Sequence, residues 1–120
     1  MPGAKAITRN LCSELVLISR IDGLGWRMLA NLEEIGEWFA ELLTDSAFPR
    51  NTKVRIMSNS HQMEGIVKSC KFEERLGFIV TVKLSPKSRW SERWFTPKHL
   101  LRLWGGAETK VSPLKAASGY

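Results

Sequence analysis

Alternation of apolar and polar side chains is the clearest pattern along this chain, and it predicts β-strands. Residues 78–84 (FIVTVKL) carry the strongest such signal, and residues 52–57 (TKVRIM) alternate in the same way. Residues 14–19 (ELVLIS) form a short apolar run that is typical of a buried strand. Residues 26–35 and 63–72 complete a set of short strands separated by turns, which predicts a mainly β fold.

Residues 31–43 (NLEEIGEWFAELL) fit two patterns. A helix would place Leu32, Ile35, Phe39 and Leu42 on one face. A strand–turn–strand arrangement would break at Gly36. The local pattern slightly favours the helix.

The end of the chain predicts a short C-terminal helix over residues 96–104. Thr96 can serve as its N-cap, Pro97 suits the first helical position, and the glycine pair at 105–106 would end it. Residues 105–120 are small and polar, which predicts a disordered tail, and residues 1–10 predict a flexible arm. One domain, residues 11–104, is then a small β-barrel with a helical lid.

Composition limits the class of protein more than it names a function. A chain of 120 residues with 43% hydrophobic residues is one folded domain. It has two cysteines and no apolar run that is long enough for a membrane span or a secretory signal, so we expect a cytoplasmic protein without a disulfide framework. The net charge is +6, and residues 50–102 hold twelve basic residues against four glutamates, which favours an anionic partner.

Residues that could support catalysis are sparse, so we expect no enzyme. His61 and His99 have no Cys or carboxylate at metal-ligand spacing, and no phosphate-binding glycine motif occurs. Cys12 and Cys70 are isolated and are expected to be core thiols. No cofactor is predicted.

Three segments together resemble the PilZ domain family. Residues 32–42 (LEEIGEWFAEL) resemble its strand–turn–strand with the motif D/N-x-S-x-x-G, and FPRNTKVRI followed by MEGIVKSC resembles the hairpin that follows. RWSERWFTPKHLL at residues 89–101 is very similar to the C-terminal signature W-S-x-x-x-F-x-P-x-H-L-L of a bacterial subgroup. The resemblance covers roughly residues 5–103 and implies a six-stranded antiparallel β-barrel with a short C-terminal α-helix. It also implies two strands, in place of a helix, at residues 31–43.

Many PilZ domains bind the bacterial second messenger cyclic di-GMP, and the resemblance assigns five positions to that ligand. The family's R-x-x-x-R pair corresponds to Lys5 and Arg9. Guanidinium groups suit this role because they stack on purines and bond phosphate oxygens in pairs, and Lys5 keeps the charge without the planar group.

The second motif is degenerate. Its acidic or amide position corresponds to Glu34, its serine to Gly36 and its final glycine to Phe39. A register shifted by one or two residues would use Asn31, Glu33 and Gly36 instead. The first register is preferred because it also matches the family's apolar pattern. Loss of two or three charged hydrogen bonds, each worth ~1.5–3 kcal/mol, would weaken binding by roughly two to five decades.

These observations lead to three hypotheses. The first is a cyclic di-GMP receptor for signalling, and the second is a PilZ-like adaptor that has lost the ligand and binds a protein partner, with five tryptophans as candidate contacts. The third, a nucleic-acid binder, ranks last. A basic and aromatic cluster at Arg89, Trp90, Arg93, Trp94 and Phe95 could stack on bases. We favour the alternative that Trp94 or Phe95 packs the C-terminal helix against the barrel mouth and that the arginines face water.

Overall fold

The computed structural model describes residues 7–22, 27–59 and 61–104. They form seven strands and one 3-10 helix, in the order β1 (Ile7–Arg20), β2 (Arg27–Ile35), β3 (Phe39–Thr44), β4 (Lys53–Ser58), β5 (His61–Glu73), β6 (Gly77–Leu84), η1 (Pro86–Ser88) and β7 (Leu101–Trp104). The expected mainly β fold is confirmed. Residues 7–10 of the predicted arm belong to β1, while residues 1–6 and the predicted tail lie outside the described residues.

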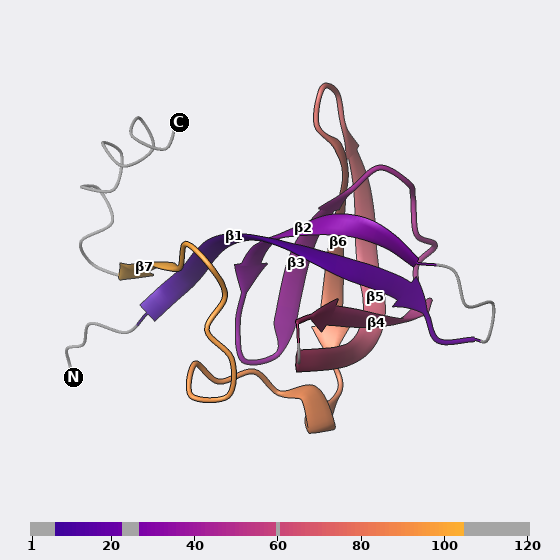
Figure 1. Ribbon diagram of the computed structural model, residues 1–120. Coiled ribbons are helices and arrows are strands. Elements are labelled where there is room, and N and C mark those ends of the chain that lie inside the picture. The colour runs from indigo at the N-terminus through magenta and orange to yellow at the C-terminus, as the bar shows by residue number, and fades with distance from the viewer. Residues whose placement is uncertain (1–6, 23–26, 60, 105–120) are drawn as a thin grey trace.

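Strands β1 to β6 close into an antiparallel barrel (Figure 1). The sheet order is β2-β3-β6-β5-β4-β1-β7, and an additional pairing of β1 with β2 closes the ring. Strand β1 reaches three neighbours because it is long, pairing with β2 over residues 11–19, with β4 over residues 17–20 and with β7 over residues 7–11. The hairpin of β5 and β6 projects beyond the barrel, at the top of Figure 1. None of the described segments forms a helix long and apolar enough to cross a membrane.

The ambiguous residues 31–43 are two paired strands. Leu32 pairs with Leu42 and Ile35 with Ala40, and the chain turns between them at residues 36–38. The slightly favoured helix is therefore wrong, and the strand–turn–strand is confirmed. Long-range pairing decides the outcome, because β2 also pairs with β1 and β3 with β6, which leaves Leu32 and Leu42 fully buried.

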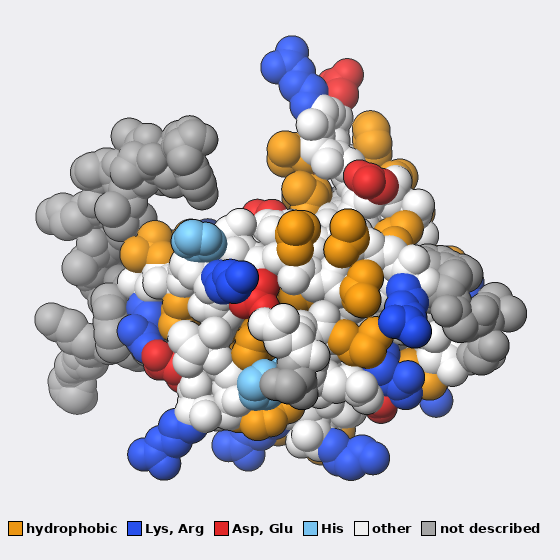
Figure 2. Space-filling model, in the orientation of Figure 1, with side chains coloured by type: hydrophobic (Ala, Val, Ile, Leu, Met, Phe, Trp, Pro, Cys, Tyr) orange, Lys and Arg blue, Asp and Glu red, His pale blue; other side chains and the backbone are white. Residues whose placement is uncertain are grey.

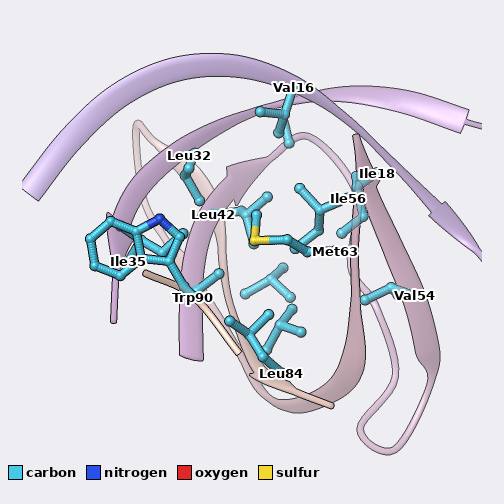
Figure 3. Packing of buried hydrophobic residues seen from close by; sticks show 14 of the residues in the cluster. Val16, Ile18, Leu32, Ile35, Leu42, Val54, Ile56, Met63, Leu84 and Trp90 are labelled. Atoms are coloured by element: carbon cyan, nitrogen blue, oxygen red, sulfur yellow. The ribbon is translucent and has the colours of Figure 1, made fainter. Parts of the chain in front are cut away.

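Inward-facing side chains fill the barrel with one apolar core (Figure 3). Each of the strands β1 to β6 contributes inward-facing residues, such as the alternate residues Val16 and Ile18 of β1 and Val54 and Ile56 of β4. This alternation is the pattern that the sequence predicts for a strand with one buried face. Trp90 lies beside Ile35 at one end of the core, so the segment after η1 closes that end of the barrel (Figure 3).

The predicted C-terminal helix over residues 96–104 does not form. Residues 101–104 are strand β7, which pairs with residues 7–11 of β1. His99 has a φ of 58°, in the left-handed region that a right-handed helix excludes, and the backbone N–H of Lys98 donates to Glu14 Oε1 at 2.7 Å. The unpaired backbone of β1 therefore outweighs the local cap signal of Thr96 and Pro97.

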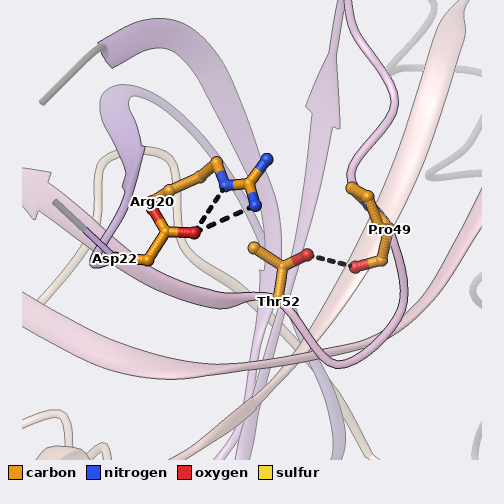
Figure 4. A network of polar contacts seen from close by, with 4 residues as sticks. All are labelled: Arg20, Asp22, Pro49 and Thr52. Atoms are coloured by element: carbon orange, nitrogen blue, oxygen red, sulfur yellow. Dashed lines mark hydrogen bonds and ion pairs between the residues drawn. The ribbon is translucent and has the colours of Figure 1, made fainter. Parts of the chain in front are cut away.

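Polar contacts stabilise the other end of the barrel (Figure 4). Thr52 Oγ1 donates to the carbonyl of Pro49 at 2.6 Å, which fixes the turn that leads into β4. Arg20, the last residue of β1, forms an ion pair with Asp22 at 2.9 Å. These contacts are local, and they lie away from the turn between β2 and β3, where the candidate site described below is centred.

Candidate functional site

The turn between β2 and β3 is the centre of the candidate site. Gly36 N donates to the carbonyl of Phe39 at 2.8 Å, which closes a tight turn around Glu37 and Trp38. The carbonyls of these two residues also accept hydrogen bonds, Glu37 from Trp90 N at 3.0 Å and Trp38 from Leu84 N at 2.8 Å. One backbone hydrogen bond therefore closes the turn, and two more fix it against the end of β6 and the segment after η1.

Arg9 and Glu34 form a bidentate ion pair beside this turn. Arg9 Nη2 lies 2.7 Å from Glu34 Oε1, and Arg9 Nε lies 3.1 Å from Oε2. The carboxylate is buried, whereas 53% of the Arg9 side chain is exposed. The hydrogen bonds to Glu34 raise the pKa of Arg9, against the opposing effect of its burial. Sequence reasoning predicted both residues as ligand contacts, and the structure shows that they bind each other.

Gly36 and Phe39 also contact each other. A Cβ atom built on Gly36 would lie 2.5 Å from Cε1 and 2.9 Å from Cδ1 of the Phe39 ring. The ring therefore occupies the space that a serine side chain at position 36 would need. Phe39 is half-buried at the start of β3 and, among the described residues, lies outside the core cluster.

Backbone conformation does not require glycine at either position. Gly77 is the only described glycine with a positive φ, and Phe39 does not occur among the described residues with positive φ. The turn therefore carries no side chain at Gly36 and a bulky one at Phe39, and neither position has a strained backbone.

A cavity of about 540 Å³ lies against this turn. Three predicted ligand residues line it, namely Arg9, Gly36 and Phe39. Glu34 is held beside them by its bonds to Arg9, and Lys5 lies outside the described residues. The structure thus brings together four of the five predicted positions, although their binding of a ligand remains a prediction.

Asn10 and Arg89 also line the cavity, and sequence reasoning missed both of them there. Asn10 Oδ1 is buried and has no hydrogen-bond partner, so it offers an unused acceptor. No pattern in the sequence distinguishes Asn10. Arg89 was noted in the basic and aromatic cluster, but its partners could not be foreseen because Glu37 and Trp38 lie about fifty residues earlier.

The interpretation we favoured for the rest of that cluster is confirmed in part, because Phe95 packs in the core although no helix follows it within the described residues. Trp90 and Phe95 are buried, and Trp90 Nε1 donates to the carbonyl of Phe95 at 2.8 Å. Trp94 is partly exposed and meets the ring of His61 edge to face at 5.8 Å. Arg89 is the exception, because its guanidinium does not simply face water: it bonds Glu37 and lies over the ring of Trp38.

Charge around the cavity is closely balanced. Arg9 is paired with Glu34, and Arg89 Nε lies 2.5 Å from Glu37 Oε2. Burial raises the pKa of Glu41, on β3 opposite Glu34, and the Glu34 charge adds to the increase. Elsewhere, Arg55 and Arg102 pair with Glu64 and Glu92, and Figure 2 shows acidic side chains scattered among the basic ones. An anionic ligand would therefore have to compete with carboxylates of the chain itself.

Groups that could bind a metal do not assemble in the described part of the chain, where no cluster of three His, Cys, Asp or Glu residues occurs. Cys12 is buried, and burial together with nearby glutamates raises the pKa of its thiol to about 12. Cys70 is half-exposed, and its Sγ accepts a hydrogen bond from Phe48 N at 3.5 Å.

Comparison with protein-family models, with curated proteins and with solved structures finds no match to this chain. Any statement about its function therefore depends on its own residues and geometry.

Proposed function

We propose that this chain is a PilZ-type signalling module that binds cyclic di-GMP weakly, in the cavity beside the turn of residues 36–39. The observation that carries the proposal is that the cavity is lined by Arg9, Gly36 and Phe39 from two separate strands and a turn, with Glu34 bonded to Arg9. These are positions that the PilZ resemblance assigns to the ligand. A volume of about 540 Å³ is within the usual range for small-molecule sites.

Weak affinity follows from two features of the site, the Arg9–Glu34 ion pair and the position of the Phe39 ring. A phosphate that binds Arg9 must compete with Glu34, whose carboxylate is already in bidentate geometry. The ring of Phe39 covers Gly36, where the family has a hydroxyl group. Both features remove ligand interactions worth ~1.5–3 kcal/mol each if the group is charged.

Isothermal titration of the full chain with cyclic di-GMP tests this proposal. We expect measurable heat in the wild type and none in Arg9→Ala. Arg27→Ala is the matched control, because Arg27 is exposed at the far end of β2 from the turn and should leave binding unchanged. An absence of heat in the wild type at high micromolar ligand would refute the proposal.

A second candidate is a ligand-independent adaptor, and exposed leucines favour it. Leu15 on β1 and Leu29 on β2 are 68% and 61% exposed, and Leu29 pairs with Leu17 across the two strands. Exposed apolar clusters of this kind are typical of protein-binding surfaces. This alternative predicts that a protein partner is recovered by Arg9→Ala but lost by Leu15→Ser/Leu29→Ser. Recovery of no specific partner by the wild type would count against it.

A further inference from the structure

Arg89 is held between two residues that are themselves fixed. Ser88 is buried, and its Oγ accepts a hydrogen bond from Glu64 N at 2.9 Å. Trp90 is buried in the core, and its backbone N–H donates to Glu37 at 3.0 Å. The backbone on both sides of Arg89 is therefore immobilised, although 59% of the Arg89 side chain is exposed.

The side chain of Arg89 is also held in place. Its Nε bonds Glu37 Oε2 at 2.5 Å, and its Cζ lies 5.2 Å from the centre of the Trp38 ring. Glu37 and Trp38 are the two residues of the fixed turn, so the backbone that carries both partners of the guanidinium is held in place. An arginine that is held at its edge and supported on an indole loses little further freedom when a ligand binds.

The position of Arg89 places this fixed guanidinium beside the cavity, where a ligand can contact it. Arg89 lines the cavity, whereas Trp38 is not among the described residues that line it. Because Glu37 balances its charge, Arg89 offers the cavity chiefly a flat surface. A purine base stacks on such a surface.

The other residues of the cavity suit the remaining parts of a nucleotide. The bonds from Arg9 to Glu34 use Nε and Nη2, which leaves Nη1 for a phosphate oxygen. Asn10 also lines the cavity, and its Oδ1 has no hydrogen-bond partner within the described chain.

We infer that Arg89, supported by Trp38 and Glu37, is the surface on which the base of a purine nucleotide stacks in this cavity. This inference rests on the proposed function and adds to it a residue outside the five positions that the resemblance assigns. Trp38 acts through Arg89 as a positioning residue.

Titration of full-length variants with cyclic di-GMP and, separately, with ribose 5-phosphate tests the inference. Arg89→Ala and Trp38→Ala should weaken cyclic di-GMP by roughly 5-fold to 150-fold, the loss expected for one stacked base. Arg89→Lys keeps the charge but not the plane, and it should lose about as much as Arg89→Ala. Trp38→Phe should stay close to the wild type because it keeps an aromatic support. Ribose 5-phosphate, which has no base, should bind all variants equally.

Arg93→Ala is the matched control, since Arg93 is exposed four residues after Arg89 and is not among the described residues that line the cavity. Wild-type binding that weakens in Arg9→Ala but not in Arg89→Ala, Arg89→Lys or Trp38→Ala would overturn the inference and leave the proposed function intact. Equal losses for ribose 5-phosphate would overturn it as well, because Arg89 would then act by charge. A wild type that binds no cyclic di-GMP would overturn both.

Discussion

The contact between Gly36 and Phe39 can be tested because Gly36→Ala should lower the free energy of unfolding when the Phe39 ring is present and raise it when the ring is removed. In Gly36→Ala the new Cβ would lie 2.5, 2.9 and 3.4 Å from three atoms of the Phe39 ring. Carbon atoms pack best at ~3.5–4.0 Å, so the ring must move by about 1 Å. Overpacking of this kind costs ~1–3 kcal/mol, and the lower chain entropy of alanine in the unfolded state returns ~0.4–1 kcal/mol. We expect a net loss of roughly 1–2 kcal/mol in the free energy of unfolding.

In a Phe39→Ala background the ring is gone. Phe39→Ala alone should cost less than the ~3–5 kcal/mol of a buried phenylalanine, because Phe39 is only half-buried. Gly36→Ala added to it should then stabilise by ~0.4–1 kcal/mol, because the φ of Gly36 lies outside the left-handed region. The same substitution thus destabilises one background and stabilises the other.

Urea unfolding of the four proteins of this cycle, followed by circular dichroism, measures the coupling. Gly65→Ala is the comparison, because a Cβ there would lie 2.3 Å from the backbone oxygen of Lys83, which cannot rotate away. That variant should be strongly destabilised in either background. If Gly36→Ala changes stability by the same amount with and without the Phe39 ring, the steric argument fails.

Three further predictions concern affinity, pH and thiol chemistry. Gly36→Ser/Phe39→Gly should bind cyclic di-GMP about 10-fold or more tightly than the wild type by titration, since it restores the hydroxyl and removes the ring that excludes it; unchanged affinity would contradict this. Glu41→Gln should raise stability at pH 7, because a carboxyl whose pKa is raised on folding destabilises the folded state once it is ionised. Urea midpoints of the two proteins should converge below about pH 4, where the carboxyl is protonated in both states; a constant difference would argue against the effect. In the native protein at pH 8, a thiol reagent should modify Cys70 but not Cys12, whose thiol has a pKa of about 12 and is buried; mass spectrometry that finds both labelled would refute it.

The mainly β fold was predictable because its signal is local. A strand with one buried face has a period of two residues, and β4 and β6 carry it clearly within six and eight residues. The turn at Gly36 was less certain, because residues 31–43 also fit a helical period, and only the resemblance to a family favoured two strands. The pairing of β2 with β1 and of β3 with β6 depends on partners that a local window does not contain.

The candidate site was predictable in part. The resemblance assigned Arg9, Gly36 and Phe39, which line one cavity, and Glu34, which bonds Arg9 beside it. The contacts among them were not foreseen, because side-chain partners are set by distances across the barrel and not by separation along the chain. For the same reason, the sequence predicted that Arg89 faces water, whereas its guanidinium bonds Glu37 in the structure.

Sequence alone therefore determined the strands with clear alternation, such as β4 and β6, and their apolar faces, since alternation within a few residues is sufficient to bury one side. The tertiary structure decided which strands are neighbours, that residues 101–104 pair with β1 instead of forming a helix, and that both cationic side chains of the cavity are matched by carboxylates. Backbone groups of β1 and the charges of Arg9 and Arg89 can be satisfied only by residues that folding brings close, so no local pattern could specify their partners.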